Sequence, residues 1–158
     1  MDPALKKYLE NHSIKYQIYN HPAVFTVAEA KAIKEKFPAQ HAKCLFLKDD
    51  KGKFYLVGMK ADKRLDTKAL RKYLHVEKLH FASPEELKQE LNLTPGSVSI
   101  FGMIYSKNTI LLIDKEVWEA KAVGFHPNIN TATLVIDNEN LKRYCNSLNC
   151  KKEVIEIG

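Results

Sequence analysis

Residues 42–58 read AKCLFLKDDKGKFYLVG and carry the plainest fold signal in the chain. Two apolar runs, Ala42 to Leu47 and Phe54 to Gly58, flank the polar stretch Lys48-Asp49-Asp50-Lys51-Gly52. Short apolar runs joined by a polar turn that contains glycine are typical of a β-hairpin. We therefore expect two antiparallel strands at this point.

Helices and further strands surround this hairpin. Residues that can cap a helix stand before periodic apolar segments, and two stretches have the spacing of a capping box, Thr26-Val27-Ala28-Glu29 and Ser83-Pro84-Glu85-Glu86. We expect helices at 3–12, 26–37, 66–74, 83–92, 115–120 and 137–145. The other expected strands lie at 14–19, 80–81, 110–113, 131–136 and 154–157. Because helices and hairpin-joined strands are mixed without regular βαβ alternation, we predict an α+β fold. It would be a single compact domain over residues 1–158, with a mixed, mostly antiparallel sheet flanked by helices.

The composition favours a globular protein over a membrane or secreted one. The chain has 158 residues, of which 45% are hydrophobic and 28% charged, as in an ordinary globular domain. No apolar run approaches the roughly 18 residues of a membrane span, and residues 1–10 lack the apolar core of a signal peptide. The three cysteines form no disulfide framework. We therefore expect a cytoplasmic protein that does not associate with membranes.

The charge balance points to a polyanionic partner. Lysine and arginine number 25 against 19 aspartate and glutamate, a formal net charge of +6. Such an excess favours nucleic acid, because neutralising phosphates releases counterions. The lysines are scattered in short runs, which suits contact with backbone phosphates over a broad face. A generally lysine-rich surface without a nucleic-acid partner is the alternative.

Lys43 is the first candidate for chemistry. It interrupts a run whose other members favour burial. A lysine in that setting either extends to solvent or holds its ammonium group near an anion. The alternative is that the strand begins at Cys44 and Lys43 is solvated at the end of a loop.

Two loops and the cysteines complete the candidates. The segment from Gly124 to Thr133, with His126 inside it, is nearly uncharged and rich in hydrogen-bonding side chains, as in a loop that lines a polar site. Gly96 to Gly102 has glycines at both ends, and its backbone N–H groups could hold an oxyanion or a water. A plain turn is the alternative for each loop. The cysteines lack the spacing of a zinc site, so we expect no metal and no cofactor.

These segments, taken in order, resemble the YbaK/prolyl-tRNA synthetase-associated domain family of aminoacyl-tRNA deacylases, and most of all its ProX-type branch of freestanding editors of alanyl-tRNA(Pro). The matching stretches together span about residues 14–136. They are His21 to Ala30, His41 to Asp49, Phe81 to Glu85, Leu93 to Val98 with Phe101-Gly102, and Phe125 to Thr133.

The resemblance implies a site that receives the aminoacylated 3′ end of tRNA. Lys43 matches the signature lysine of the family, His126 lines the same pocket, and the loop at Gly96 corresponds to the family's GxxxP loop. The sequence departs from many relatives in having Ile100 in place of proline and Cys44 in place of asparagine. The implied catalytic residues are Lys43, His126 and Gly96. The expected substrate-binding residues are Val24, Phe25, Thr26, Cys44, Ser97, Val98, Ser99, Asn128, Thr131 and Ala132.

The implied function is trans-editing of Ala-tRNA(Pro), with a ribose hydroxyl of the substrate assisting hydrolysis. The implied partners are the tRNA(Pro) acceptor end carrying alanine and prolyl-tRNA synthetase. An aminoacyl ester is already activated, so hydrolysis needs placement and electrostatic help more than a protein nucleophile. Two alternatives stay open: an enzyme for Cys-tRNA(Pro) or another aminoacyl-tRNA, and a non-catalytic tRNA-binding module of the same fold.

Overall fold

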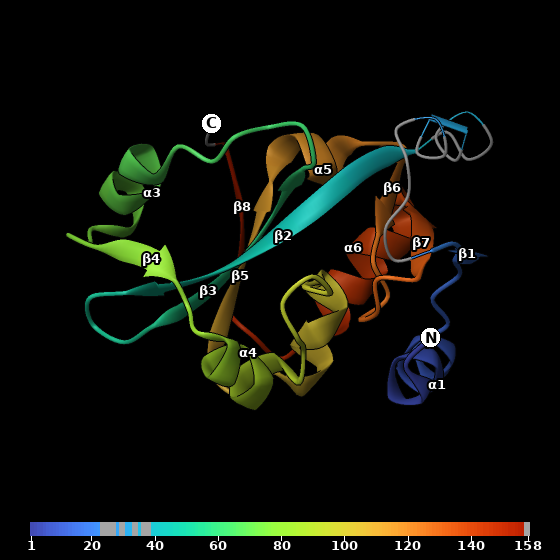
Figure 1. Cartoon of the computed structure of the whole chain (residues 1–158), viewed down its shortest axis with the longest axis horizontal. Helices are drawn as coiled ribbons and strands as arrows, with labels where there is room; N and C mark the ends of the chain where they lie inside the picture. The colour runs from blue at the N-terminus through green and yellow to red at the C-terminus, as the bar shows by residue number, and fades with distance from the viewer. Residues whose placement is uncertain (23–27, 29–30, 33–34, 36–38, 157–158) are drawn as a thin grey trace.

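A twisted sheet with helices packed on its faces forms the molecule (Figure 1). The computed structural model describes residues 1–22, 28, 31, 32, 35 and 39–156. The strands run in the order β1-β7-β6-β2-β3-β5-β8, and β4 pairs with β2. Their bounds are Gln17–Asn20 (β1), Gln40–Asp49 (β2), Phe54–Lys60 (β3), Leu79–Phe81 (β4), Thr109–Asp114 (β5), Ala122–Phe125 (β6), Ala132–Asp137 (β7) and Lys152–Ile155 (β8).

The pairings confirm the predicted fold class. Four pairs are antiparallel, β1 with β7, β2 with β3, β2 with β4 and β6 with β7. Three are parallel, β2 with β6, β3 with β5 and β5 with β8. Among the described residues the sheet is therefore mixed and mostly antiparallel. The β2–β3 hairpin predicted from 42–58 lies at its centre.

The helices begin where the sequence predicts. They are Pro3–Asn11 (α1), Thr67–Leu74 (α3), Pro84–Leu91 (α4), Lys115–Glu119 (α5) and Asn138–Ser147 (α6), with a 3₁₀ helix, Ile100–Tyr105 (η1). Asp2, Asp66, Ser83 and Asp137 each accept a backbone N–H at a helix start, and Ser83 with Glu86 forms a complete capping box. These caps satisfy N–H groups that have no partner inside the helix.

Some expectations differ from the structure, and one falls mostly outside the described residues. β1 begins at Gln17 and not at Ile14, because Ser13 has a φ of 55° and the Ile14 N–H donates to the Leu9 carbonyl to close α1. β6 and η1 were not expected from the sequence. The core-facing residues of the helix predicted at 26–37, Ile33 and Phe37 among them, lie outside the described residues, although Ala28, Lys31, Ala32 and Glu35 are helical.

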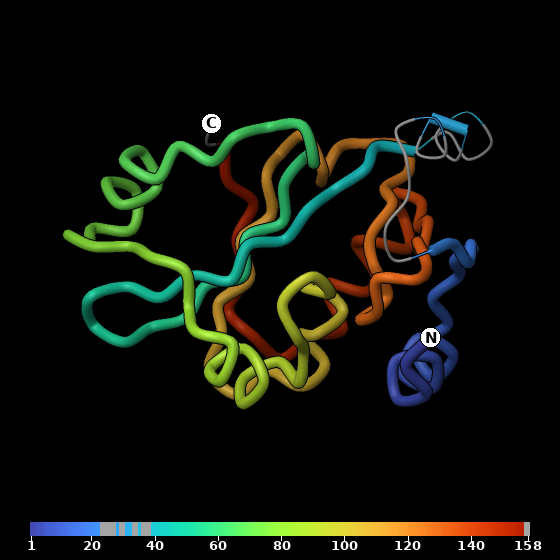
Figure 2. Tube along the Cα trace, in the orientation of Figure 1, coloured from blue at the N-terminus to red at the C-terminus, as the bar shows by residue number. Residues whose placement is uncertain are grey.

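The two faces of the sheet bury different apolar clusters. On one face, Cys44 and Phe46 of β2 pack with residues of α1, α4, η1 and α6, including the fully buried Tyr144. On the other, Leu47 of β2 packs with β3 and with Leu70 of α3. Figure 2 shows the N-terminal segment beside the C-terminal third of the chain, consistent with the pairing of β1 with β7.

Strands β2 and β6 form a fork. They pair in parallel only at Gln40–Val123 and His41–Gly124. Beyond His41, β2 leaves β6 and pairs with β3 and β4. Ligands in sheets with parallel strands bind where neighbouring strands diverge at their carboxyl ends. The β2–β6 fork is therefore the place in the fold to look for a site.

Candidate functional site at the β2–β6 fork

Lys43 lies inside strand β2. The strand begins at Gln40, so the alternative that it begins at Cys44 is wrong. Because side chains alternate along a strand, Lys43 is on the face opposite the buried Cys44 and on the same face as its partner Met59. Its side chain is half-buried, and no ion pair of Lys43 is found among the described residues.

His126 directly follows β6, which ends at Phe125. Lys43 and His126 are each two residues beyond the last β2–β6 pair, His41 with Gly124, and continued alternation from that pair would direct both side chains to one face of the sheet. The Nδ1 atom of His126 is 3.1 Å from the Ala132 carbonyl oxygen. A carbonyl only accepts hydrogen bonds, so Nδ1 carries the proton and Nε2 presents a lone pair. The loop that leaves β6 therefore carries an imidazole acceptor in its neutral form.

Three further side chains share this face, and no periodicity of the sequence pointed to them. Thr133 of β7 and His41 of β2 approach each other across Gly124, where a Cβ would lie 3.2 Å from Thr133 Cγ2 and 3.7 Å from His41 Nδ1. The His21 ring is 2.8 Å from Thr133 Oγ1 through Nε2. The order of strands, which no local pattern reveals, makes these side chains neighbours. In the sequence, only the segments that contain His21, His41 and His126 could have suggested them.

The loop at Gly96 lies beside the loop that follows β6. Gly96 has a φ of +90°, and a Cβ there would lie 4.0 Å from Asn130 Nδ2, in the loop that follows β6. Gly96 adopts this conformation without the strain that a side chain would bring. The Gly96 loop and the loop that carries His126 are therefore neighbours.

Several hydrogen bonds of the Gly96 loop are already used within the protein. The Ser97 N–H donates to the Thr94 carbonyl, and Ser99 is fully buried and caps η1 by accepting the Phe101 N–H. Ile100 packs toward Gly58 on the core side, 3.4 Å from a Cβ built there. Val98 is half-buried against the core. These contacts hold the loop in place and leave fewer free N–H groups than its sequence suggests.

The other predicted binding residues fall into three groups. Asn128, with a φ of 64°, donates through Nδ2 to Asp2 and to the Phe101 carbonyl, which ties its loop to α1 and η1. Thr131 is exposed. Cys44 and Ala132 are buried on the core side of the sheet. Val24, Phe25 and Thr26 lie outside the described residues.

The Cys44 thiol has no features of a nucleophile. It is 8% exposed, and burial raises its pKa to about 12, so it stays protonated at neutral pH. In the described part of the chain, no group of three or more His, Cys, Asp or Glu side chains has the arrangement of a metal site.

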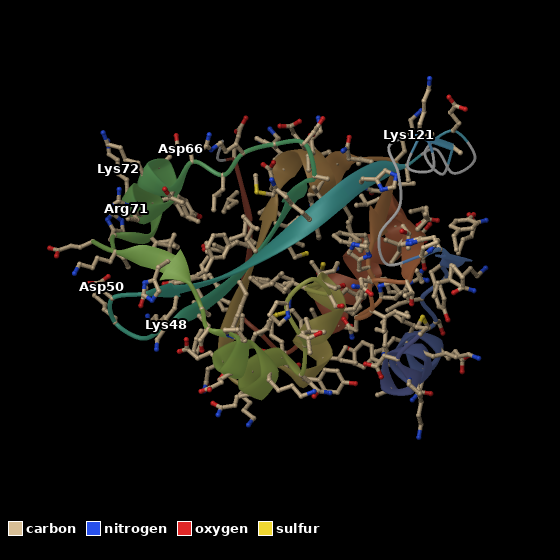
Figure 3. All side chains as sticks on the ribbon, in the orientation of Figure 1. Lys48, Asp50, Asp66, Arg71, Lys72 and Lys121 are labelled. Atoms are coloured by element: carbon tan, nitrogen blue, oxygen red, sulfur yellow. The ribbon has the colours of Figure 1, made fainter. Side chains whose placement is uncertain are left out.

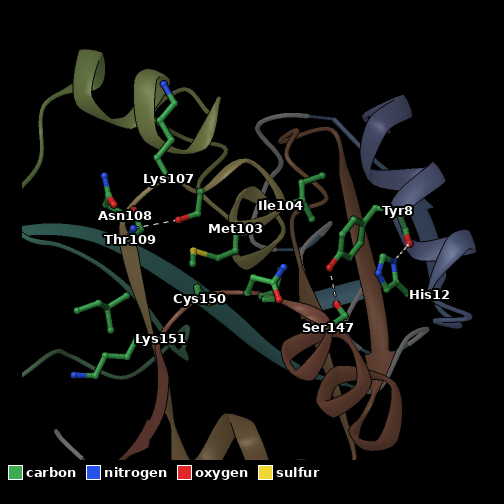
Figure 4. Close-up of a pocket in the computed structure, with 14 residues that line it drawn as sticks. Tyr8, His12, Met103, Ile104, Lys107, Asn108, Thr109, Ser147, Cys150 and Lys151 are labelled. Carbon is green, nitrogen blue, oxygen red and sulfur yellow. Dashed lines mark hydrogen bonds between the residues drawn. The ribbon is translucent and has the colours of Figure 1, made fainter.

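A separate cavity of about 480 Å³ lies between η1, the start of β5 and the end of α6 (Figure 4). Tyr8 and Ser147 on its wall bond to each other at 2.7 Å, and Ser106 accepts the Thr109 N–H. None of the predicted site residues that the structure describes lines it. Thr109 on the cavity wall is paired with Phe54, which is paired with Lys48. Lys43 precedes Lys48 by five residues in β2, which separates the two lysines by roughly 16 Å along the strand. The cavity is therefore distinct from the fork.

Cationic side chains are spread over the surface (Figure 3). Arg71 and Lys72 lie on α3 at one end of the molecule, and Lys121 lies near the opposite end. Lys48 is paired with Glu86 at 2.6 Å, and Lys63 with Asp114 and Glu116. Among the residues described, no helix is long and apolar enough to cross a membrane.

Comparison with known proteins shows the family of the chain. Residues 21–144 match the family model described as the aminoacyl-tRNA editing domain. The chain is 35% identical over 138 residues to the prolyl-tRNA editing protein ProX of Acetoanaerobium sticklandii, covering 85% of this chain and 84% of that protein. It is 30% identical to prolyl-tRNA synthetase associated domain-containing protein 1 of Bos taurus, covering 86% and 83% of the two chains.

Solved structures support the fold. One, described as a proposed trans-editing enzyme for prolyl-tRNA synthetase, superimposes with a TM-score of 0.73 at 18% identity, covering 100% of this chain and 99% of that chain. Another, of a hypothetical protein, has the same TM-score at 19% identity and covers 94% and 97%. The family match and the 35% identical relative confirm the expected resemblance: the chain belongs to the aminoacyl-tRNA editing domain family and is an aminoacyl-tRNA deacylase.

Proposed function

We propose that this chain hydrolyses the ester bond of alanine mischarged on tRNA(Pro), in trans, at the β2–β6 fork. The observation that supports the proposal is the β2–β6 register, in which Lys43 and His126 each come two residues after the last pair, His41 with Gly124. The names of the relatives, a prolyl-tRNA editing protein and prolyl-tRNA synthetase associated domain proteins, support tRNA(Pro) as the carrier.

Lys43 and His126 have different roles in this proposal. The compact Lys43 ammonium binds a phosphate of the 3′ end or the negative charge that develops on the ester. His126, with Nδ1 held by the Ala132 carbonyl, presents Nε2 as an acceptor to the substrate. A ribose hydroxyl beside the ester activates the attacking water or relays its proton, so no protein nucleophile is required. The Gly96 loop orients the carbonyl or the water from the opposite side.

Selectivity for alanine follows from size. A synthetase pocket built for proline cannot strongly reject a smaller amino acid, because each missing methylene is worth only about 1–3 kcal/mol. A second site that admits alanine and excludes proline by overlap corrects the error. Forcing extra methylenes into a packed site costs on the order of 1–3 kcal/mol or more. It also displaces the carbonyl from the position needed for reaction.

Partners and location extend the proposal. The chain acts as one domain over residues 1–158, in the cytoplasm, on the acceptor end of tRNA(Pro) released by prolyl-tRNA synthetase. The synthetase is the partner that would supply mischarged tRNA.

The deciding experiment follows the loss of label from Ala-, Ser-, Cys- and Pro-tRNA(Pro) under single-turnover conditions. We expect rapid hydrolysis of Ala-tRNA(Pro), slower hydrolysis of the serine analogue, and no acceleration with Pro-tRNA(Pro). Equal rates for alanine and proline would exclude the editing assignment. A preference for cysteine would move the chain to the other substrate class, and no hydrolysis of any ester would indicate a binding module.

A further inference from the structure

We propose that His21 is a positioning residue for His126, an inference that rests on the proposed role of His126 in deacylation. The two rings lie edge to face, with centroids 6.3 Å apart. His21 follows β1 and His126 follows β6, so the two rings come from segments far apart in the chain. Their contact places His21 beside the imidazole that faces the substrate.

Both nitrogens of His21 are held. Nδ1 lies 2.9 Å from the Pro22 carbonyl, which can only accept, so Nδ1 carries the proton. Nε2 lies 2.8 Å from Thr133 Oγ1 and therefore accepts the hydroxyl proton when the ring is neutral. Thr133 is only 8% exposed, so this hydrogen bond is shielded from water. A ring with both nitrogens bonded has one preferred orientation.

The same short segment of β7 holds both histidines. The His21 N–H donates to the Thr131 carbonyl at 2.8 Å, and the His21 ring bonds to the Thr133 hydroxyl. Between them, the Ala132 carbonyl accepts from His126 Nδ1. Residues 131–133 therefore fix His21 at both ends and His126 in the middle. His21 acts on the reaction by holding the plane of the His126 ring, and so keeps Nδ1 aimed at the Ala132 carbonyl that sets its tautomer.

The geometry of Gly124 is consistent with this arrangement. Gly124 lies between Thr133 and His41, and a Cβ there would press on Thr133 Cγ2 at 3.2 Å. The absence of a side chain lets Thr133 reach the position from which its hydroxyl bonds His21.

The test measures the tautomer of His126 directly. Long-range ¹H–¹⁵N spectra at about pH 8, where an ordinary histidine is neutral, should give His126 as the Nδ1–H form in the wild-type chain. In Thr133→Val, which keeps the volume and removes the hydroxyl, and in His21→Ala, we expect a second tautomer. We also expect kcat for Ala-tRNA(Pro) to fall roughly tenfold with KM within about twofold, since an orienting partner is lost.

Matched variants separate positioning from stability. Thr133→Ser keeps the hydroxyl and should restore both the single tautomer and kcat. Thr109→Val removes a buried hydroxyl that donates to Glu90, far from the fork, and should leave both unchanged. An unchanged Nδ1–H tautomer of His126 in both Thr133→Val and His21→Ala would overturn the inference. If the tautomer shifts but the wild-type chain hydrolyses no aminoacyl-tRNA, the proposed function fails and the positioning stands.

Discussion

Lys43 keeps an ammonium group on a strand whose neighbours are buried. Its flanking residues, Ala42 and Cys44, pack toward the core, while Lys43 lies on the opposite face beside Met59. The strand thus fixes the lysine backbone rigidly and leaves only the side chain to adjust. A rigid anchor of this kind suits a group that must meet a charge at one place.

We expect Lys43→Ala to lower kcat/KM for Ala-tRNA(Pro) by on the order of a hundredfold or more, the size of effect seen when a charge-stabilising donor is removed. Lys43→Arg should fail as well, because a planar guanidinium does not replace a compact ammonium. Rates from single-turnover deacylation and thermal midpoints measured in parallel distinguish loss of chemistry from loss of fold.

Lys48→Ala is the matched control on the same strand. Lys48 pairs with Glu86 and lies over the Phe54 ring at 5.5 Å, so its removal should lower stability and leave turnover nearly unchanged. Wild-type turnover in Lys43→Ala would contradict the anchor.

At the scale of single residues, the sequence predicts part of the site. Lys43 and His126 were singled out from their settings, and in the structure each comes two residues after the last β2–β6 pair. His21 and Thr133 were not predicted as partners, because they are separated by more than a hundred residues and no local pattern links them. Ser99, predicted to contact substrate, is fully buried, and its hydroxyl accepts the Phe101 N–H at the start of η1.

The capping box of α4 joins this helix to the β2–β3 hairpin. Glu86 accepts the Ser83 N–H through one oxygen and the Lys48 ammonium, 2.6 Å away, through the other. The bond from Lys48, with that from Ser83, lowers the pKa of Glu86 from 4.5 to about 2. Helix α4 is therefore fixed to β2 by a charge that exists only above that pKa.

This coupling predicts an acid-sensitive contribution to stability. Because the folded pKa is depressed, the stabilisation is fully present above about pH 4.5 and is lost as the pH falls toward 2. Urea unfolding midpoints of Glu86→Gln should therefore fall less steeply than those of the wild-type chain across this window. Glu139→Gln, which removes an exposed carboxylate 3.3 Å from Arg143, is the control and should keep the wild-type slope. Parallel slopes for Glu86→Gln and wild type would contradict the role of the Lys48–Glu86 pair.

Elements with a local signal were predicted well. The starts of α1, α3, α4 and α6 follow from capping side chains that act within one turn. β6 was missed because Ala122–Phe125 is short and contains Gly124, which weakens a strand pattern. It is a strand because β2 and β7 flank it and pair with its backbone. η1 was missed because tertiary contacts, such as the Tyr144 hydroxyl donating to the Ile100 carbonyl, select it.

For the whole molecule, the net charge of +6 predicts that the affinity for tRNA depends on the ionic strength of the solution. We expect the affinity for tRNA to fall by roughly tenfold or more between about 50 and 200 mM salt, with a negative log–log slope, because phosphate contacts release counterions. Filter binding or fluorescence anisotropy measures the slope.

The phosphate-free ester 3′-alanyl-adenosine is the control substrate. Its rate of hydrolysis should stay nearly constant over the same range of salt. A flat response for tRNA itself would mean that bases and the aminoacyl group dominate recognition.

The order of strands is the part of the fold that the sequence could not give. The pairing of β8 with β5, and that of β1 with β7, join segments with no pattern in common. Local propensity defines the strands, but long-range packing decides which of them become neighbours.

The pairing of β1 with β7 has a consequence for biosynthesis. Gln17 lies opposite Val135 in the antiparallel pair. At roughly 5–20 residues per second of translation, β1 waits on the order of ten seconds for its partner to be made. During that interval Leu5 and Leu9 of α1, both fully buried in the finished protein, lack most of the core that covers them. The nascent chain therefore exposes the apolar face of α1 until the η1 and α6 residues that share its core have been translated.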